Sequence, residues 1–329
     1  MKRSWCAATV FAALLAFFPA AAGAELRLAL DAGIGYMGGD ASFEIGKVVN
    51  DATGQELLPF PISRLEYPLD LVMATVRGEL SAGDRWSFHL EARKDLDDGS
   101  EPAKDSDWFY YQGSQVVPPL VYSETEVEVD AWVVDSGVRY AIYQGYHRGW
   151  DELYGRKPAM RWSYGLGLGY QYRKLDYDEN NLDQWYPLIP SLPHDRVPGA
   201  VAVYEVRHDI PYAEIFVNLD YKDRLTLEVS LGGSAFAHVE DKGHWLLRGL
   251  VFSMDSDWDG EAVMGSVRAK YRFTDHWFTA LTLDMEQVNT SSESTSFSPA
   301  TGHYSIGAET SSGSWFVGLT AGYRFGGGD

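Results

Sequence analysis

Two aspartates, Asp105 and Asp107, lie two positions apart within an acidic stretch. On an extended segment, residues at this spacing point to the same face, about 7 Å apart along it. Crowded carboxylates raise each other's pKa, so that one can hold a proton while the other holds a water molecule. The pair is therefore a candidate for acid–base chemistry. An acidic loop exposed to solvent would show the same pattern.

A second chemically capable segment is 240–245, which reads Glu-Asp-Lys-Gly-His-Trp. Its histidine, His244, has an intrinsic pKa that suits a general base, and an incidental histidine at a rim is the alternative. The chain has eight histidines, but they are scattered without the spacing of a catalytic zinc site, so no metal is expected. The sequence also has no Gly-rich phosphate loop and no nucleophile-elbow motif, so no cofactor is expected.

The elements that position these residues read as β-strands. In 314–325, every second residue from Trp315 on is apolar or aromatic and reads Trp-Val-Leu-Ala-Tyr-Phe, whereas the residues between them are mostly small or polar. The segments 277–287 and 225–239 alternate in the same way. In 225–239 the polar set includes His238. One apolar face toward lipid and one small or polar face toward a lumen is typical of a transmembrane barrel strand. A soluble β-sandwich also alternates, but aromatic residues at the strand ends favour membrane girdles.

Turn lengths differ between the two ends of the predicted strands. Short polar turns at 82–85, 221–224 and 274–276 are expected on the periplasmic side. Long segments rich in Asp, Ser, Pro and Gly are expected outside, namely 44–63, 96–121, 177–199, 240–260 and 289–301. Predicted strands start near Leu26, Leu65, Trp86, Glu124, Met160, Ala200, Leu225, Gly260, Trp277 and Tyr304. The sequence thus predicts an all-β fold, a ten-stranded antiparallel transmembrane β-barrel.

The N-terminus has the pattern of a secretory signal peptide. Lys2 and Arg3 precede an apolar run at 7–18, which ends in the small residues Ala-Gly-Ala at 22–24. The run is shorter than the roughly 20 residues that a spanning helix needs, although a retained anchor is the alternative. We therefore expect residues 1–24 to be the signal peptide and residues 25–329 to form the barrel domain.

Composition after cleavage limits the partners. Loss of Lys2 and Arg3 from 27 basic residues leaves 25 against 47 acidic residues, a net charge of −22. This balance argues against nucleic acid and suits cationic peptides, although acidic external loops give the same charge. The single cysteine, Cys6, lies in the expected signal peptide, so the mature chain has no disulfide. A monomer is expected.

The order of several motifs resembles the omptins, a family of ten-stranded outer-membrane endopeptidases. The matching segments run over nearly the whole mature chain, and they are Ser-Arg-Leu-Glu-Tyr at 63–67, Asp-Ser-Asp-Trp at 105–108, Gly-Tyr-Gln at 169–171, Arg207 with Ile-Pro-Tyr at 210–212, the segment 240–245, and Ala-Gly-Tyr-Arg-Phe at 321–325. The order and spacing of these motifs together carry the resemblance. The resemblance implies an outer-membrane location in a Gram-negative bacterium with the active face outside the cell.

The resemblance also implies a mechanism. In omptins two aspartates on one wall face a histidine–aspartate pair on the other, and water between them attacks the peptide carbonyl. Carried over by position, Asp105 and Asp107 would be the aspartate pair and His244 the general base. Omptins cut between basic residues, and the resemblance assigns Glu240 and Glu44 to the acidic substrate-binding pockets.

One position departs from the family pattern, because Lys242 stands where the aspartate of the dyad belongs. A lysine cannot accept the imidazole N–H, and loss of the orienting carboxylate in a serine-protease triad costs about 10⁴ in rate. A β-bulge at Gly243 would rotate Asp241 onto the face of His244. We therefore hypothesise that Asp241 supplies the missing acid.

Omptins also require lipopolysaccharide on the outer wall, and the resemblance assigns that contact to Tyr170, Lys174 and Arg207. Lipopolysaccharide is thus expected as an activator, although such a set also serves as ordinary interfacial anchoring. An insertion at 144–157 has no counterpart in the family. Three interpretations stay open: an omptin-like endopeptidase, a catalytically inactive barrel of the same fold acting as an adhesin or structural protein, and a diffusion pore, which a narrow ten-stranded lumen disfavours.

Overall fold

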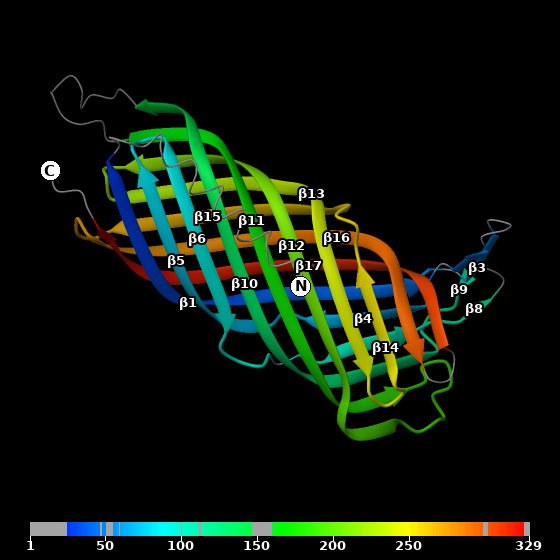
Figure 1. Cartoon of the computed structure of the whole chain (residues 1–329). Coiled ribbons are helices and arrows are strands. Elements are labelled where there is room, and N and C mark those ends of the chain that lie inside the picture. The colour runs from blue at the N-terminus through cyan, green and yellow to red at the C-terminus, as the bar shows by residue number, and fades with distance from the viewer. Residues whose placement is uncertain are drawn as a thin grey trace, which may run out of the picture.

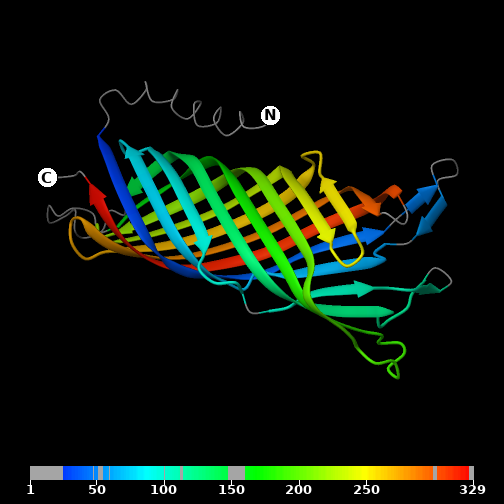
Figure 2. The same ribbon diagram turned by 60° about the horizontal axis from the view of Figure 1, so that its bottom comes forward.

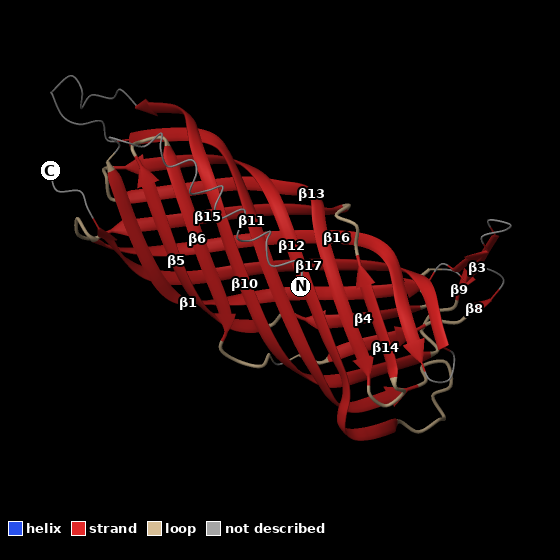
Figure 3. Cartoon of the chain, viewed as in Figure 1, coloured by secondary structure: helices blue, strands red, loops and turns tan. Residues whose placement is uncertain are grey.

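The computed structural model describes residues 25–46, 48–50, 55–58, 60–99, 101–111, 114–146, 160–298 and 302–325. The expected signal peptide and most of the insertion at 144–157 lie outside the described residues. The described chain consists of strands joined by loops (Figure 3). Among these residues no helix has the length and apolar character needed to cross a membrane.

Antiparallel strands close into a ring (Figure 1). Strand β1 (Leu26–Gly46) pairs with β17 (Gly302–Phe325) on one side and with β4 (Ser63–Pro68) and β5 (Leu71–Ala82) on the other. The ring continues through β6 (Trp86–Asp95) with β7 (Ala103–Asp107), β10 (Val121–Tyr146), β11 (Met160–Trp185), β12 (Asp195–Tyr221), β13 (Leu225–Trp245), β14 (Leu250–Asp255) with β15 (Gly260–Arg272), and β16 (Trp277–Ser298). Three wall strands consist of two segments each, so the ring has ten strands, which confirms the predicted fold class.

The two ends of the barrel differ (Figure 2). At one end, here called the turn end, β1 begins, β17 ends, and the predicted short connections at 83–85, 222–224 and 273–276 join neighbouring strands. At the opposite end, the loop end, the hairpins β2 (Val48–Asn50) with β3 (Gln55–Leu58) and β8 (Tyr110–Tyr111) with β9 (Ser114–Gln115) project beyond the wall.

The wall reaches further toward the loop end than the sequence suggested. The segments 96–121, 177–199 and 240–260, predicted as long external stretches, contain β7, the end of β11, the start of β12, and the end of β13 with β14. Many of their polar side chains, such as Lys242 and Glu240, lie on the outward face. Their inward side chains join one buried apolar cluster, so these segments pair as strands rather than lie free as loops.

The outer wall nearer the turn end carries an apolar belt. Its exposed side chains include Leu28, Ile34, Leu166, Ile215, Leu231, Leu281 and Leu319. Aromatic residues border this belt, with Trp86, Tyr221, Tyr271 and Trp277 toward the turn end and Tyr36, Trp132 and Trp315 toward the loop end. A belt of this kind, flanked by aromatic girdles, is what the outer wall of a transmembrane barrel requires.

A β-bulge in β13 reverses which side chains face inward. Between the pairs Ala213–Gly233 and Asp209–His238, β13 has one residue more than β12. The register with β15 shifts in the same interval, between Ser234 and Ala237. Because side chains alternate along a strand, the extra residue moves every later side chain to the other face. His238, expected among the lumen-facing residues, consequently lies on the outer face.

Candidate functional site

Asp105 and Asp107 lie on β7, in the wall near the loop end. They pair with Leu65 and Ser63 of β4, and the inward-facing Leu65 belongs to the buried apolar cluster. Both aspartates therefore face the lumen side, as their spacing predicted. The Ser63 hydroxyl donates to Asp105 Oδ1 at 3.3 Å, so β4 helps to position this carboxyl.

Burial and neighbouring charge perturb this pair. Burial raises the pKa of the Asp105 carboxyl well above its usual range, and the charges of Asp107 and Glu179 raise it further. Burial also raises the pKa of Asp107. The guanidinium of Arg248 acts in the opposite direction on both groups. The pair can thus share a proton, which is the property expected of a carboxylate pair that holds water.

Sequence analysis missed a third acid, Glu179 of β11, which lies beside this pair. Its carboxylate accepts hydrogen bonds from Tyr67 Oη and Thr125 Oγ1, both at 2.8 Å. Glu179, Asp105 and Trp245 line the same small cavity. The sequence offered one signal for it: Glu179 lies two residues after Tyr177, so both side chains point to the same, inward side of β11. Its approach to Asp105 depends on the register of β7 and β11 against β10, which is not visible in the sequence.

His244 does not face Asp105 and Asp107. On β13 the inward side chains are Asp241 and Trp245, both buried, with Gly243 between them. His244 has the opposite parity, and its register partners Val203 and Val251 are about two-fifths exposed on the outer face. The imidazole therefore belongs to the outer wall.

The hypothesis that Asp241 supplies the dyad acid is wrong in this structure. The register from Asp241 to His244 runs without a break against both β12 and β14, so there is no bulge at Gly243. Asp241 is fully buried, and its Oδ1 accepts the backbone N–H of Met254 at 3.1 Å. Gly243 is glycine because the ring of Phe252 lies over it, where a Cβ would be 2.0 Å from the nearest ring carbon.

Aromatic side chains from several strands fill the lumen in the loop-end half of the barrel. Phe43, Tyr67, Tyr177, Tyr204 and Phe252, here called the aromatic plug, are each at least 94% buried. Ring centroids lie 4.5 Å apart in the pair Tyr67–Tyr204 and 5.2 Å apart in the pair Phe43–Phe252. Tyr67 of the plug also lines the small cavity that Asp105 of β7 and Trp245 of β13 share.

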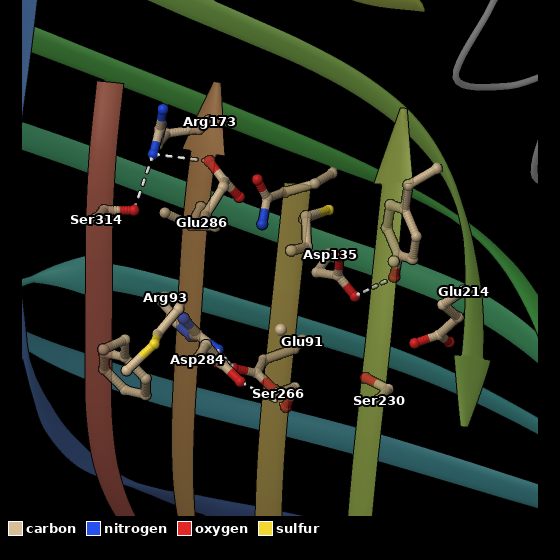
Figure 4. Close-up of a pocket in the computed structure, with 18 of the residues that line it drawn as sticks. Glu91, Arg93, Asp135, Arg173, Glu214, Ser230, Ser266, Asp284, Glu286 and Ser314 are labelled. Carbon is tan, nitrogen blue, oxygen red and sulfur yellow. Dashed lines mark hydrogen bonds and ion pairs between the residues drawn. The ribbon is translucent and has the colours of Figure 1, made fainter. Parts of the chain in front are cut away.

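Between the plug and the turn end, the lumen contains charged side chains held in pairs (Figure 4). Arg173 pairs with Glu286 at 2.9 Å, and Arg93 pairs with Asp284. Arg139 binds Glu214 at 2.6 Å and also pairs with Glu228. Such cross-lumen pairs fill the interior of a small barrel and satisfy its buried charges.

The two acids predicted for substrate binding do not form a lumen pocket. Glu44 accepts a hydrogen bond from Arg64 on the outward face of β1 and β4. Glu240 lies on the outward face of β13, paired with Arg207 and with Lys242, the latter at 2.8 Å. Both predictions assumed an inward orientation, which the bulge in β13 removes for Glu240.

Tyr170, Lys174 and Arg207, predicted from the resemblance to contact lipopolysaccharide, lie together on the outer wall. Lys174 is the register partner of Arg207. The hydroxyl of Tyr170 donates to Asp209, which also accepts the Nε–H of Arg207 at 3.1 Å. In the part of the chain that the structure describes, no group of three or more His, Cys, Asp and Glu side chains is arranged to hold a metal ion.

Comparison with solved structures identifies a fold relative. The chain is similar to the outer membrane protease OmpT from Escherichia coli, with a TM-score of 0.72 and 13% identity, over 91% of this chain and 97% of that one. The outer membrane protein OprG from Pseudomonas aeruginosa has a TM-score of 0.38 and 11% identity over 92% and 98% of the two chains. No family model and no curated protein matches the sequence. The chain thus has an omptin-like fold.

Proposed function

We propose that this chain is an outer-membrane barrel of omptin-like fold that does not hydrolyse peptides by the omptin mechanism. We place it in the outer membrane of a Gram-negative bacterium, with the loop end outside the cell, as an adhesin or structural protein. The apolar belt and the long loop-end wall support this location and orientation.

The proposal rests mainly on which side chains of β13 point into the lumen. The inward position two residues after Asp241 is Gly243, and the ring of Phe252 covers it. His244, the histidine that the sequence predicted as general base, faces the outer wall. A general base must come within hydrogen-bond reach of the proton that it removes, about 2.6–3.2 Å. An imidazole on the outer wall cannot do so for water held by Asp105 and Asp107.

An endopeptidase is the second candidate, because the Asp105–Asp107 pair faces the lumen with raised pKa values. In that case the substrate would be a cationic peptide. Lipopolysaccharide on Tyr170, Lys174 and Arg207 would act as activator. Trp245, which lines the same cavity as Asp105, would border the bound peptide.

The two candidates are separated by cleavage of a fluorogenic dibasic peptide. The refolded protein is assayed with lipopolysaccharide beside Asp107→Ala, His244→Ala and Lys242→Asp, with OmpT as a positive control. We expect no turnover above background in any form. Lys242→Asp creates no activity, because position 242 faces the outer wall. Cleavage by the wild type that is lost in both Asp107→Ala and His244→Ala would overturn the proposal.

A further inference from the structure

The lumen mouth at the turn end is basic, although the whole chain has a net charge of −20. The hollow there is lined by six basic side chains and only two acidic ones, Glu79 and Asp220. The basic residues are Arg27, Arg161, Arg224, Lys270, Arg272 and Arg324. Cations are thus gathered at one end of an otherwise acidic protein.

These side chains point into the mouth rather than toward the apolar belt. On β1, Arg27 shares its parity with the buried Asp31, and on β15, Arg272 shares its parity with the buried Arg268. On β17, Arg324 shares its parity with the buried Thr320. The backbone N–H of Arg272 donates to the carbonyl of Arg224 at 2.7 Å, so these two residues are held side by side.

Half of the six cations have a carboxylate partner among the described residues. Arg27 pairs with Glu25 at 2.9 Å, Arg161 with Asp223 at 2.8 Å, and Lys270 with Glu79 at 2.9 Å. Arg224, Arg272 and Arg324 make no ion pair within the described part of the chain, in contrast to the paired charges deeper in the lumen. The Nε of Arg324 is buried without a hydrogen-bond partner there.

We propose that this mouth binds a multivalent phosphate anion. Guanidinium groups present planar pairs of donors that match phosphate oxygens, and several of them in a concave site focus positive potential. The same unpaired cations repel one another when the site is empty, so an anion is stabilised more strongly than at isolated surface arginines. The phosphate group can belong to a free anion or to a phospholipid headgroup at the membrane edge. The inward direction of the three arginines favours the free anion.

Pyrophosphate is the probe for the test, titrated calorimetrically into protein refolded in a zwitterionic detergent at low ionic strength. We expect saturable binding with a dissociation constant of about 1 mM or tighter. The double variant Arg272→Gln/Arg324→Gln should bind at least about ten-fold more weakly, and added salt should weaken wild-type binding. Arg196→Gln, which removes an exposed loop-end arginine, is the matched control and should bind as the wild type does.

A second arm adds bicelles that contain phosphatidylglycerol. Displacement of pyrophosphate by these bicelles would assign the site to a lipid headgroup, and undisturbed binding would assign it to a free anion. Either result supports the phosphate site. Absence of saturable binding to the folded wild type would overturn it, as would equal weakening by Arg196→Gln. The heat-induced mobility shift on gels verifies that each variant is folded.

Discussion

At the residue scale, the candidate site is divided by the wall of the barrel. Asp105 and Asp107 face the lumen side, whereas His244 lies on the outer wall. Asp241 is buried, and burial raises its pKa to about 8. A carboxyl group with this pKa is largely protonated at neutral pH, so it acts as a neutral member of the core rather than as the ionised partner of a histidine.

The raised pKa of Asp241 makes a pH-dependent contribution to stability. At pH values between 3.8, the ordinary pKa of the carboxyl group, and about 8, Asp241 holds a proton in the folded state that it releases in the unfolded state. Stability therefore falls as the pH rises through this window, by at most about 1.4 kcal/mol per pH unit. We expect Asp241→Asn to flatten the pH dependence of the free energy of unfolding, measured by urea titration in lipid vesicles at pH 5 and pH 9. A variant that is less stable than the wild type at pH 9 would contradict this account.

Spacing predicted part of the site correctly. It placed Asp105 and Asp107 on one face, and it placed Asp241 opposite in parity to Glu240 and His244. The error was the bulge assigned to Gly243. Glycine there serves the close approach of Phe252, and that ring comes from a neighbouring strand whose register a single sequence does not reveal.

At the element scale, β13 decides which residues share the lumen. The short turns could be predicted from the sequence because Gly and Asp favour turns through local backbone conformation and local hydrogen bonds. It did not predict the bulge between Ser234 and Ala237, because the extra residue is defined only by pairing with β12 and β15. The same holds for β7 and β14, which read as loop but pair with the more distant strands β4 and β16.

Neighbouring residues of β12 test the two faces of the wall. Tyr204 is buried in the aromatic plug, whereas Val203 is 40% exposed on the outer face. Tyr204→Ala should lower the free energy of unfolding by about 3–5 kcal/mol, because it removes a buried aromatic ring and leaves a cavity. Val203→Ala, the matched control, should change it by no more than about 0.5 kcal/mol. Equal effects of the two variants in urea titrations would contradict the assignment of the faces.

At the scale of the whole molecule, the barrel is filled rather than open. The aromatic plug occupies the loop-end half, and ion pairs such as Arg173–Glu286 and Arg268–Asp31 cross the lumen below it. This filling argues against a diffusion pore, since a ten-stranded ring leaves room for little more than its own side chains.

The filled lumen predicts that the protein does not conduct ions. Purified protein added to planar lipid bilayers should give no stepwise current, because the charges of Arg139, Glu214 and Glu228 are paired across the lumen. Reproducible conductance steps from the wild type, absent in mock-refolded samples, would show that the interior is open.

The most direct test of the central claim is the accessibility of positions 241, 244 and 245. The only cysteine, Cys6, lies in the expected signal peptide, so single cysteines are introduced into a cysteine-free background. A bulky water-soluble maleimide is added to the folded barrel. We expect rapid labelling of His244→Cys, and protection of Asp241→Cys and Trp245→Cys until the protein is unfolded. Protection of position 244 with labelling at 241 would place the histidine inside and contradict the account.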